Sequence, residues 1–132
     1  PLTGLQVLLV DDDADTRNFF TFVLQQAGAI VTPVASAEQA LKTLIQTKPD
    51  VLLSDIGMPE MDGYMLIQQV RCLKQEQGGQ IPAIALTAYV GEMDSQQAIA
   101  AGFQRHISKP VEPAELVAVI ANLTKPANLV DH

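Results

Sequence analysis

Negative charge is concentrated in one short stretch of the sequence, VLLVDDDADTR (residues 7–17). Asp11, Asp12 and Asp13 directly follow an apolar run, and Asp15 stands two positions later. Carboxylates this close repel one another, and removing any of them from water is costly. The repulsion between carboxylates in one crevice is relieved in either of two ways: one carboxylate binds a proton, or a divalent cation binds between them. Oxygen ligands with room for water favour Mg²⁺ or Mn²⁺ as that cation.

Three more residues with useful chemistry stand where other apolar runs end. Asp55 closes the run DVLLSD, Thr87 lies near the end of IPAIALTA, and Lys109 follows FQRHIS. A carboxylate can accept a phosphoryl group, a hydroxyl can donate a hydrogen bond to it, and a lysine ammonium can neutralise its charge. If these side chains meet the acidic cluster, together they form the parts of a phosphoryl-transfer site.

The elements that must bring these residues together are predicted by the spacing of apolar residues. Short apolar runs alternate with segments whose apolar residues recur at helical spacing. The expected strands are 5–10, 29–35, 50–55, 81–88 and 103–108, and the expected helices are 14–28, 36–47, 64–73, 91–102 and 109–123. In the third of these helices, we expect Met65 to contact the core and Cys72 to be buried or half-buried.

Alternating strands and helices predict an α/β fold with one doubly wound, mostly parallel sheet covered by helices on both faces. Pro33 favours an edge position for the second strand, because proline lacks the N–H that a central strand needs. In an open sheet of this kind, ligands bind beyond the carboxyl ends of the strands. The residues that this rule brings to one crevice are Asp11, Asp12, Asp55, Thr87 and Lys109.

The composition limits the possible classes of protein. A chain of 132 residues, 48% hydrophobic and 17% charged, is typical of one folded domain. A net charge of −7 without a basic stripe argues against nucleic-acid binding. No apolar run approaches the roughly 20 residues of a membrane span, so no membrane contact is expected. Cys72 is the only cysteine, which excludes an intrachain disulfide and fits a reducing compartment.

Four pieces of the sequence carry a resemblance to a known family: LLVDDD, VLLSDIGMPEMDGY, IALTA and HISKP. In this order and spacing, over roughly residues 5–123, the chain resembles the receiver domain of response regulators, the CheY-like superfamily. The resemblance implies a flavodoxin-like (βα)5 domain whose five parallel strands lie in the order 2-1-3-4-5. It also implies a receiver domain at residues 1–123, followed by a tail or linker at 124–132.

The same resemblance implies roles for individual residues. Asp55 is the phosphoacceptor, which takes a phosphoryl group from the phosphohistidine of a partner. Asp12, Asp55 and the backbone carbonyl of Gly57 bind Mg²⁺ directly, and Asp11 binds it through water. Mn²⁺ can substitute for Mg²⁺.

The resemblance also implies residues that bind the phosphoryl group and residues that change conformation when it is bound. Lys109, Thr87 and the backbone of Ala88 bind the phosphoryl group. Thr87 and His106 form the switch. The peptide bond before Pro110 is expected to be cis, a geometry that is essentially confined to bonds before proline.

Three positions depart from the commonest pattern of the family. His106 stands where Tyr or Phe is usual, and imidazole is smaller and can titrate near neutral pH. The alternative to a switch role is that His106 is an ordinary strand residue. Gly57 has no side chain to contact an attacking water, and Tyr89 is large enough to cover the phosphoryl group. These last two positions predict an aspartyl-phosphate that hydrolyses slowly.

Two other functions remain open at this point. A haloacid-dehalogenase-like phosphatase also uses a nucleophilic Asp and Mg²⁺, but Asp15 stands where its motif requires Thr or Val. A degenerate receiver could serve only as a docking module, although this chain retains the site residues. A calcium loop of the EF-hand type is excluded, because Thr16 and Phe22 occupy the positions of its glycine and glutamate.

Some acidic residues are better explained by helix formation than by chemistry. Asp13 and Asp15 lie where the first helix begins, and carboxylates stabilise helix N-termini. Asp62 precedes the third helix and is expected to cap it.

The resemblance also implies partners and a location. The phosphoryl donor is a sensor histidine kinase or a histidine phosphotransfer protein, the output effector is undefined, and the location is cytoplasmic. Because the chain begins at Pro1 and ends in TKPANLVDH, we expect a receiver excised from a longer protein, such as a hybrid sensor kinase. A stand-alone regulator is the alternative.

Overall fold

The computed structural model describes residues 2–58, 61–87, 92–109 and 111–124, and it confirms the α/β fold expected from the sequence. Five parallel strands form one sheet in the predicted order β2-β1-β3-β4-β5. The strands are β1 (Gln6–Val10), β2 (Ile30–Val34), β3 (Val51–Asp55), β4 (Ala83–Thr87) and β5 (Arg105–Ser108). The helices are α1 (Ala14–Gln26), α2 (Ala37–Thr47), α3 (Gly63–Arg71), α4 (Glu92–Ala101) and α5 (Pro113–Leu123), with a short 3₁₀ helix η1 (Gln75–Gln77) before β4.

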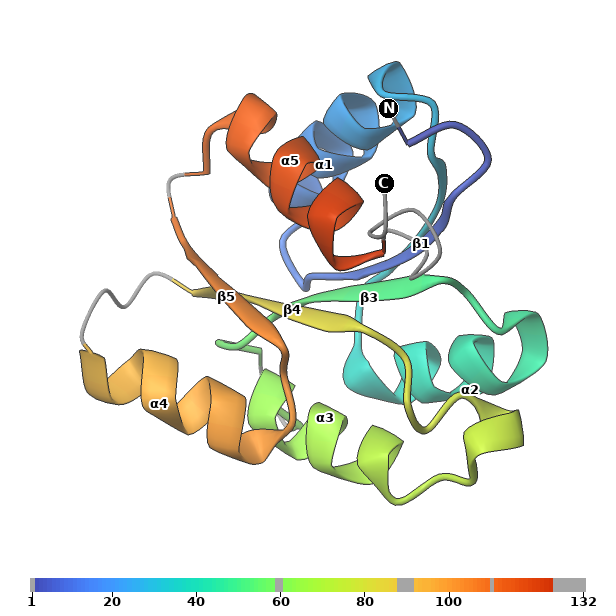
Figure 1. Ribbon diagram of the computed structural model, residues 1–132, viewed down its shortest axis with the longest axis vertical. Helices are drawn as coiled ribbons and strands as arrows, with labels where there is room; N and C mark the ends of the chain where they lie inside the picture. Colours follow the sequence, from blue (N-terminus) through green and yellow to red (C-terminus); the bar gives the residue numbers. More distant parts are fainter. Residues whose placement is uncertain (1, 59–60, 88–91, 110, 125–132) are drawn as a thin grey trace, which may run out of the picture.

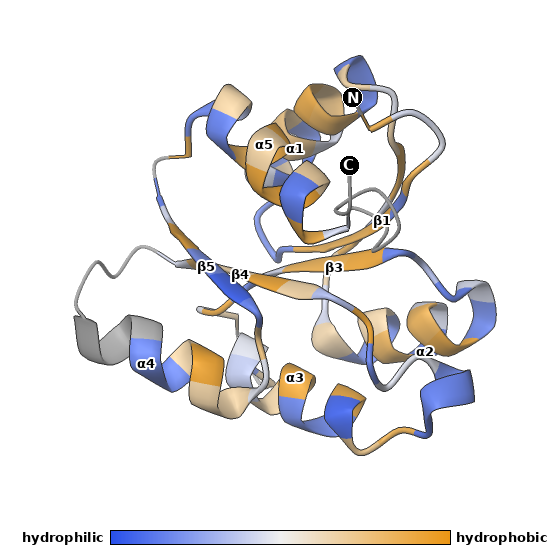
Figure 2. Ribbon diagram, in the orientation of Figure 1, coloured by the Kyte–Doolittle hydropathy of each residue, from blue (hydrophilic) through white to orange (hydrophobic). Residues whose placement is uncertain are grey.

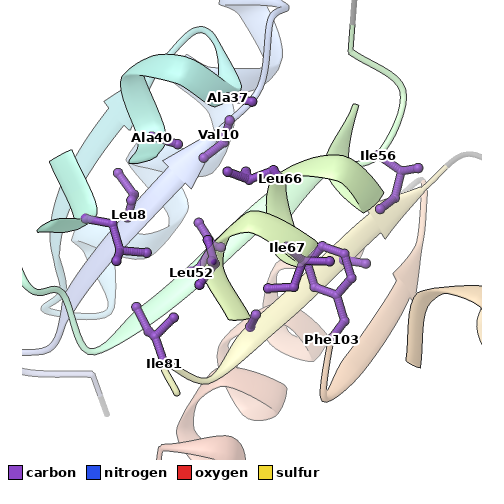
Figure 3. Packing of buried hydrophobic residues seen from close by; sticks show 14 of the residues in the cluster. Leu8, Val10, Ala37, Ala40, Leu52, Ile56, Leu66, Ile67, Ile81 and Phe103 are labelled. Atoms are coloured by element: carbon purple, nitrogen blue, oxygen red, sulfur yellow. The ribbon is translucent and has the colours of Figure 1, made fainter. Parts of the chain in front are cut away.

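Helices cover both faces of the sheet: α1 and α5 lie on one face, and α2, α3 and α4 lie on the other (Figure 1). Successive side chains of a strand point to opposite faces, so the core is divided into two clusters. In β1, Val7 and Leu9 pack on the side of α1 and α5, whereas Leu8 and Val10 pack on the other side. Figure 3 shows this second cluster, with Leu52 of β3 near its centre. Among the described residues, no helix is both long and apolar enough to cross a bilayer.

The central strands are apolar along their length because helices cover both of their faces. Every residue of β3 and β4 is buried, and Figure 2 shows the apolar character of the central sheet. β2 differs, since none of its five residues is fully buried. It forms an edge of the sheet, which confirms the position predicted from Pro33.

The helix starts follow the capping signals in the sequence. Asp13 is the N-cap of α1, and its carboxylate accepts a hydrogen bond from the N–H of Thr16 at 3.1 Å. Asp62 is the N-cap of α3, and its carboxylate accepts from the N–H of Met65 at 2.9 Å. Asp15 lies in the first turn of α1, where negative charge is favoured. The structural roles predicted for these three aspartates are confirmed.

Two predictions about burial in the third helix were wrong. Met65 is 45% exposed, and Cys72 is exposed. Leu66, Ile67 and Val70 form the buried face of α3, and Met65 lies outside that face. The helix ends one residue before Cys72, which is its C-cap, so Cys72 does not continue the helix or its buried face.

Candidate functional site

The residues predicted to share a crevice lie at the carboxyl edge of the sheet. Asp11 directly follows β1, Asp55 is the last residue of β3, Thr87 is the last residue of β4, and Lys109 directly follows β5. β1 and β3 are neighbours in the parallel ladder, and β4 and β5 continue it on one side. The register of the sheet therefore brings together residues that are far apart in the sequence.

Lys109 links two of the carboxylates. Its Nζ lies 3.2 Å from Oδ1 of Asp55 and 3.6 Å from Oδ2 of Asp11. Its backbone N–H donates to the carbonyl of Thr87 at 2.7 Å, which fixes the start of the side chain against the end of β4. An ammonium group has three N–H donors, so Lys109 can keep a carboxylate contact and also donate to a phosphoryl oxygen.

Asp11 is held in place by its own segment of chain. Its Oδ1 accepts a hydrogen bond from the N–H of Asp13 at 2.9 Å, and its carbonyl accepts one from Nη1 of Arg17 at 2.8 Å. Its Oδ2 is buried and has no hydrogen-bond partner, and Nζ of Lys109 is too far away to donate one. Burial raises the pKa of the Asp11 carboxyl; the N–H of Asp13 opposes this rise, and the charge of Asp55 adds to it.

A divalent cation fits this arrangement of oxygens. One carboxylate oxygen from each of Asp11, Asp12 and Asp55 lies within 4.8 Å of the other two. Asp12 is exposed while Asp11 and Asp55 are buried, so the cluster is open to water on one side. Mg²⁺ usually keeps several waters and binds through one or two carboxylates. The buried oxygen of Asp11 without a hydrogen-bond partner is an additional reason for a positive charge at this point.

Gly57 lies beside the central carboxylate and is exposed. Its N–H donates to Oδ1 of Asp55 over a long distance of 3.4 Å. A Cβ atom added at Gly57 would meet no other atom within 4 Å. Packing therefore does not require glycine here, and its small size affects access to Asp55 rather than the fold.

Thr87 and His106 lie on the same side of the sheet. In the ladder between β4 and β5, Ala85 is paired with His106 and Thr87 with Ser108. Because paired side chains point the same way and alternate along a strand, all four face the side where Ala85 packs with α3 and α4. Thr87 is 2% exposed, and Nε2 of His106 is buried without a hydrogen-bond partner. His106 thus has a nitrogen available for a new contact on the side where Thr87 lies.

Three positions named by the sequence analysis, Ala88, Tyr89 and Pro110, lie outside the described residues. Arg17 was missed by the sequence analysis, although it holds the backbone of Asp11. Arg17 lies four residues after the N-cap of α1. A long side chain at that position can reach back beyond the start of the helix, and this could have pointed to its role.

The family of the chain follows from comparison with known proteins. A family model described as the response regulator receiver domain matches residues 7–121. The chain belongs to this family. It is a receiver domain of two-component systems, which confirms the resemblance and the CheY-like fold. The phosphatase alternative is not favoured, because the match spans most of the chain.

Similar proteins include a small protein, a long hybrid kinase and the receiver domain of a sensor kinase. An uncharacterized 14.6 kDa protein from the 3′ region of sodA1 in Leptolyngbya boryana is 47% identical over 119 residues, which are 90% of this chain and 89% of that protein. Hybrid signal transduction histidine kinase D of Dictyostelium discoideum is 35% identical over 133 residues, which are 96% of this chain and 9% of the kinase. The receiver domain of the sensor histidine kinase PA1611 of Pseudomonas aeruginosa has a TM-score of 0.85 and 30% identity, covering 94% of this chain and all of that chain. That structure contains a magnesium ion coordinated in its active-site cleft.

Proposed function

We propose that this receiver accepts a phosphoryl group on Asp55 and changes conformation to control an output partner or domain. One observation carries the proposal: Oδ1 of Asp55 lies 3.2 Å from Nζ of Lys109, at an edge where Asp11 and Asp12 supply further oxygen ligands. A carboxylate nucleophile beside a fixed cation and an acidic metal-binding pair has what phosphoryl transfer requires.

The chemistry begins at the carboxylate of Asp55. One of its oxygens attacks the phosphorus of a phosphohistidine on the side opposite the imidazole. The P–N bond breaks as the O–P bond forms, and the imidazole leaves with the electron pair and takes up a proton. Lys109 then donates to a phosphoryl oxygen. Because Asp55 is only 8% exposed, the donor must approach where Asp12 and Gly57 are exposed.

We assign Mg²⁺ to the acidic cluster, with Mn²⁺ able to substitute. Asp12, Asp55 and the carbonyl of Gly57 would hold the ion directly, and Asp11 would hold it through water. When bound, the ion neutralises charge on the carboxylates and on the phosphoryl oxygens. The magnesium ion in the similar PA1611 receiver and the buried oxygen of Asp11 support this assignment.

In the proposed switch, Thr87 donates to a phosphoryl oxygen and His106 follows it toward the site. Support comes from the ladder, which places both side chains on one side of the sheet. The backbone of Ala88 is proposed to donate to the same phosphoryl group. The cis bond before Pro110 is proposed to direct Lys109 into the site.

A sensor histidine kinase or a histidine phosphotransfer protein is the proposed donor, and the hybrid kinase of Dictyostelium contains a similar segment. Such donors use ATP, so we propose a cytoplasmic location. We also propose residues 1–123 as the receiver and 124–132 as a tail or linker, and the end of α5 at Leu123 supports this boundary. Catalysis is proposed to be limited to the receiver's own phosphorylation and dephosphorylation.

The decisive experiment measures the mass of the intact protein after incubation with acetyl phosphate and Mg²⁺. We expect a gain of one phosphoryl group in the parent chain and none in Asp55→Asn. Asp62→Asn is the matched control, because asparagine also caps helices and Asp62 lies outside the cluster. Equal labelling of Asp55→Asn would exclude Asp55 as the acceptor. Repeated turnover of a small phosphate ester would favour a phosphatase instead.

A further inference from the structure

Arg17 is the one basic residue in the acidic stretch of residues 11–17. It lies half-buried in α1, yet in the part of the chain that the structure describes only Lys109 forms an ion pair with a carboxylate of this stretch. The guanidinium of Arg17 instead donates from Nη1 to the backbone carbonyl of Asp11 at 2.8 Å. We propose that Arg17 is a positioning residue, which holds the carboxylate of Asp12 in place for a divalent cation.

Two of the three clustered carboxylates have contacts of their own. Asp11 and Asp55 each accept a hydrogen bond from the N–H of the residue two positions further on, at 2.9 and 3.4 Å, and each contacts Nζ of Lys109. Asp12 differs from them, because its side chain is exposed and makes no hydrogen bond or ion pair with any described residue. The position of the Asp12 carboxylate therefore depends on the backbone that carries it.

The backbone next to Asp12 is held by three hydrogen bonds. The N–H of Asp11 donates to the carbonyl of Val34 at 3.2 Å, and the carbonyl of Asp11 accepts from Arg17. Because a peptide group is planar, fixing this carbonyl also fixes the N–H and Cα of Asp12. On the other side, the N–H of Asp13 donates to the carboxylate of Asp11. Only the bond from Arg17 comes from a side chain that can be replaced without changing a metal ligand.

The bond from Arg17 is strong enough to matter for metal binding. Its donor is charged and its length is that of a charge-assisted hydrogen bond. A ligand that is already in place loses less freedom when the ion binds. Groups that hold metal ligands without touching the metal typically contribute about 10-fold to 100-fold to its affinity. We therefore expect the loss of the Arg17 guanidinium to weaken Mg²⁺ binding about tenfold.

The charge of Arg17 by itself would have the opposite effect. A positive charge near the acidic cluster repels an approaching Mg²⁺, so electrostatics alone predicts tighter binding when Arg17 is made neutral. Positioning predicts weaker binding, and the sign of the change separates the two explanations. The inference rests on the proposed magnesium site. It does not depend on phosphoryl transfer, so a failure of Asp55 to be labelled would leave it intact.

Titration of the whole chain with MgCl₂ at constant ionic strength, followed by NMR, tests the proposal. Arg17→Met should raise the dissociation constant for Mg²⁺ about tenfold, and Arg17→Lys should raise it less, since lysine keeps a charged donor on a long stem. Lys42→Met is the matched control, because it removes the same charge from an exposed position on α2 and should change the constant less than about twofold. An unchanged or lower constant in Arg17→Met would overturn the proposal. A parent chain that binds no Mg²⁺ would overturn it together with the metal assignment.

A double-mutant cycle tests whether Arg17 acts through Asp12. In a chain that already carries Asp12→Asn, Arg17→Met should change the dissociation constant less than about twofold, because the ligand that Arg17 holds is gone. Urea denaturation without Mg²⁺ measures the stability of each variant separately. A residue that only supports the fold would lower the free energy of unfolding and leave the Mg²⁺ affinity of the folded chain unchanged. The full tenfold loss in the Asp12→Asn chain would contradict a role through Asp12.

Discussion

Two cationic side chains lie at opposite ends of the sheet, and they are bound in different ways. Arg71, at the end of α3, lies at the amino edge, near the starts of β4 and β5. Lys109 lies at the carboxyl edge, among carboxylates. Both are partly buried. The partners of Arg71 hold the fold together, whereas the partners of Lys109 can also bind a ligand.

The guanidinium of Arg71 makes five hydrogen bonds to neutral oxygens. It donates to the carbonyl of Gly102 twice, at 2.8 and 3.0 Å, and to the carbonyls of Gly79 and Ile81 at 3.0 and 2.7 Å. It also donates to Oε1 of Gln104 at 2.9 Å. Burial lowers its pKa, yet arginine stays protonated in proteins. These bonds join α3 to the segments before β4 and β5, and no bound ligand is needed to satisfy them.

The ammonium of Lys109 contacts carboxylates that can also bind a ligand. Its contacts with Asp55 and Asp11 are 3.2 and 3.6 Å long, and one oxygen of Asp11 has no hydrogen bond at all. A cation and a phosphoryl group would improve both sets of contacts. The carboxyl edge, where polar groups lack full sets of hydrogen bonds, is therefore the edge of the sheet suited to chemistry.

The largest effect is expected when Lys109 is changed. Lys109→Met removes the fixed positive charge next to Asp55 and should slow labelling by acetyl phosphate with Mg²⁺ about 100-fold. Lys109→Arg keeps the charge in a different shape and should have an intermediate rate. Initial rates are measured by intact mass. An unchanged rate in Lys109→Met would show that the carboxylates and metal suffice.

The second-largest effect, on stability, is expected at Arg71 at the amino edge of the sheet. Arg71→Met leaves several carbonyl groups without a donor and should lower the free energy of unfolding by about 2–3 kcal/mol, as measured by urea denaturation. The labelling rate should stay within about twofold of the parent, since Arg71 does not contact the site. Arg71→Lys retains charge but lacks the planar fork and should recover only part of the stability. A fall in labelling as large as that of Lys109→Met would show that the two ends are not independent.

A smaller effect, of opposite sign, is expected for Asp11→Asn. The native pKa of Asp11 lies above its ordinary value of 3.8, so folding favours its protonated form. The stability gained in this way is present below the ordinary pKa and is lost as the pH rises through the native pKa. At neutral pH without Mg²⁺ the ionised group therefore costs stability, and Asp11→Asn should raise the free energy of unfolding.

Thermal unfolding of both chains at neutral pH, with and without Mg²⁺, checks this prediction. The ion should raise the unfolding temperature of the parent more than that of Asp11→Asn, because the variant has lost a carboxylate. At a pH below 3.8, the advantage of the variant should disappear. Destabilisation by Asp11→Asn at neutral pH in metal-free buffer would contradict the electrostatic explanation.

The smallest effect concerns the lifetime of the phosphoryl group. The parent is expected to keep the group for minutes or longer, because Gly57 offers no side chain to orient a water molecule. Gly57→Asn fits the open space and should shorten the half-life about threefold to tenfold, which is roughly 1 kcal/mol. Gly57→Ala controls for backbone effects and should resemble the parent. Mass is followed after removal of the donor, and a parent half-life of only seconds would disprove slow hydrolysis.

Much of the fold and most of the site geometry could be predicted from the sequence because their signals are local. Asp13 and Asp62 bind N–H groups three residues away, so their roles as helix caps are encoded within one turn. Asp55 and Lys109 end or follow apolar strands, and a parallel sheet brings such positions to one edge. Local pattern and sheet topology together were sufficient for these residues.

Other features depend on contacts that no local pattern contains. Arg71 reaches acceptors up to 33 positions away, so its role appears only in the folded chain. Phe19 repeats at helical spacing with buried residues of α1, but only the folded chain shows that its side chain is 48% exposed. The exposure of Met65 and Cys72 depends on the orientation and end of α3, which vary by a residue or two at any helix terminus.

The edge of the sheet at β2 has a consequence for aggregation. Ile30 donates its N–H to the carbonyl of Leu5, and the carbonyl of Val34 accepts from the N–H of Asp11, so these residues direct their backbone groups toward β1. The alternate residue Pro33 therefore faces outward, where it offers no N–H to an approaching strand. A foreign strand would lose a hydrogen bond at that position, which discourages sheets from joining edge to edge. Pro33 thus disfavours pairing between β2 edges when copies of the chain are crowded.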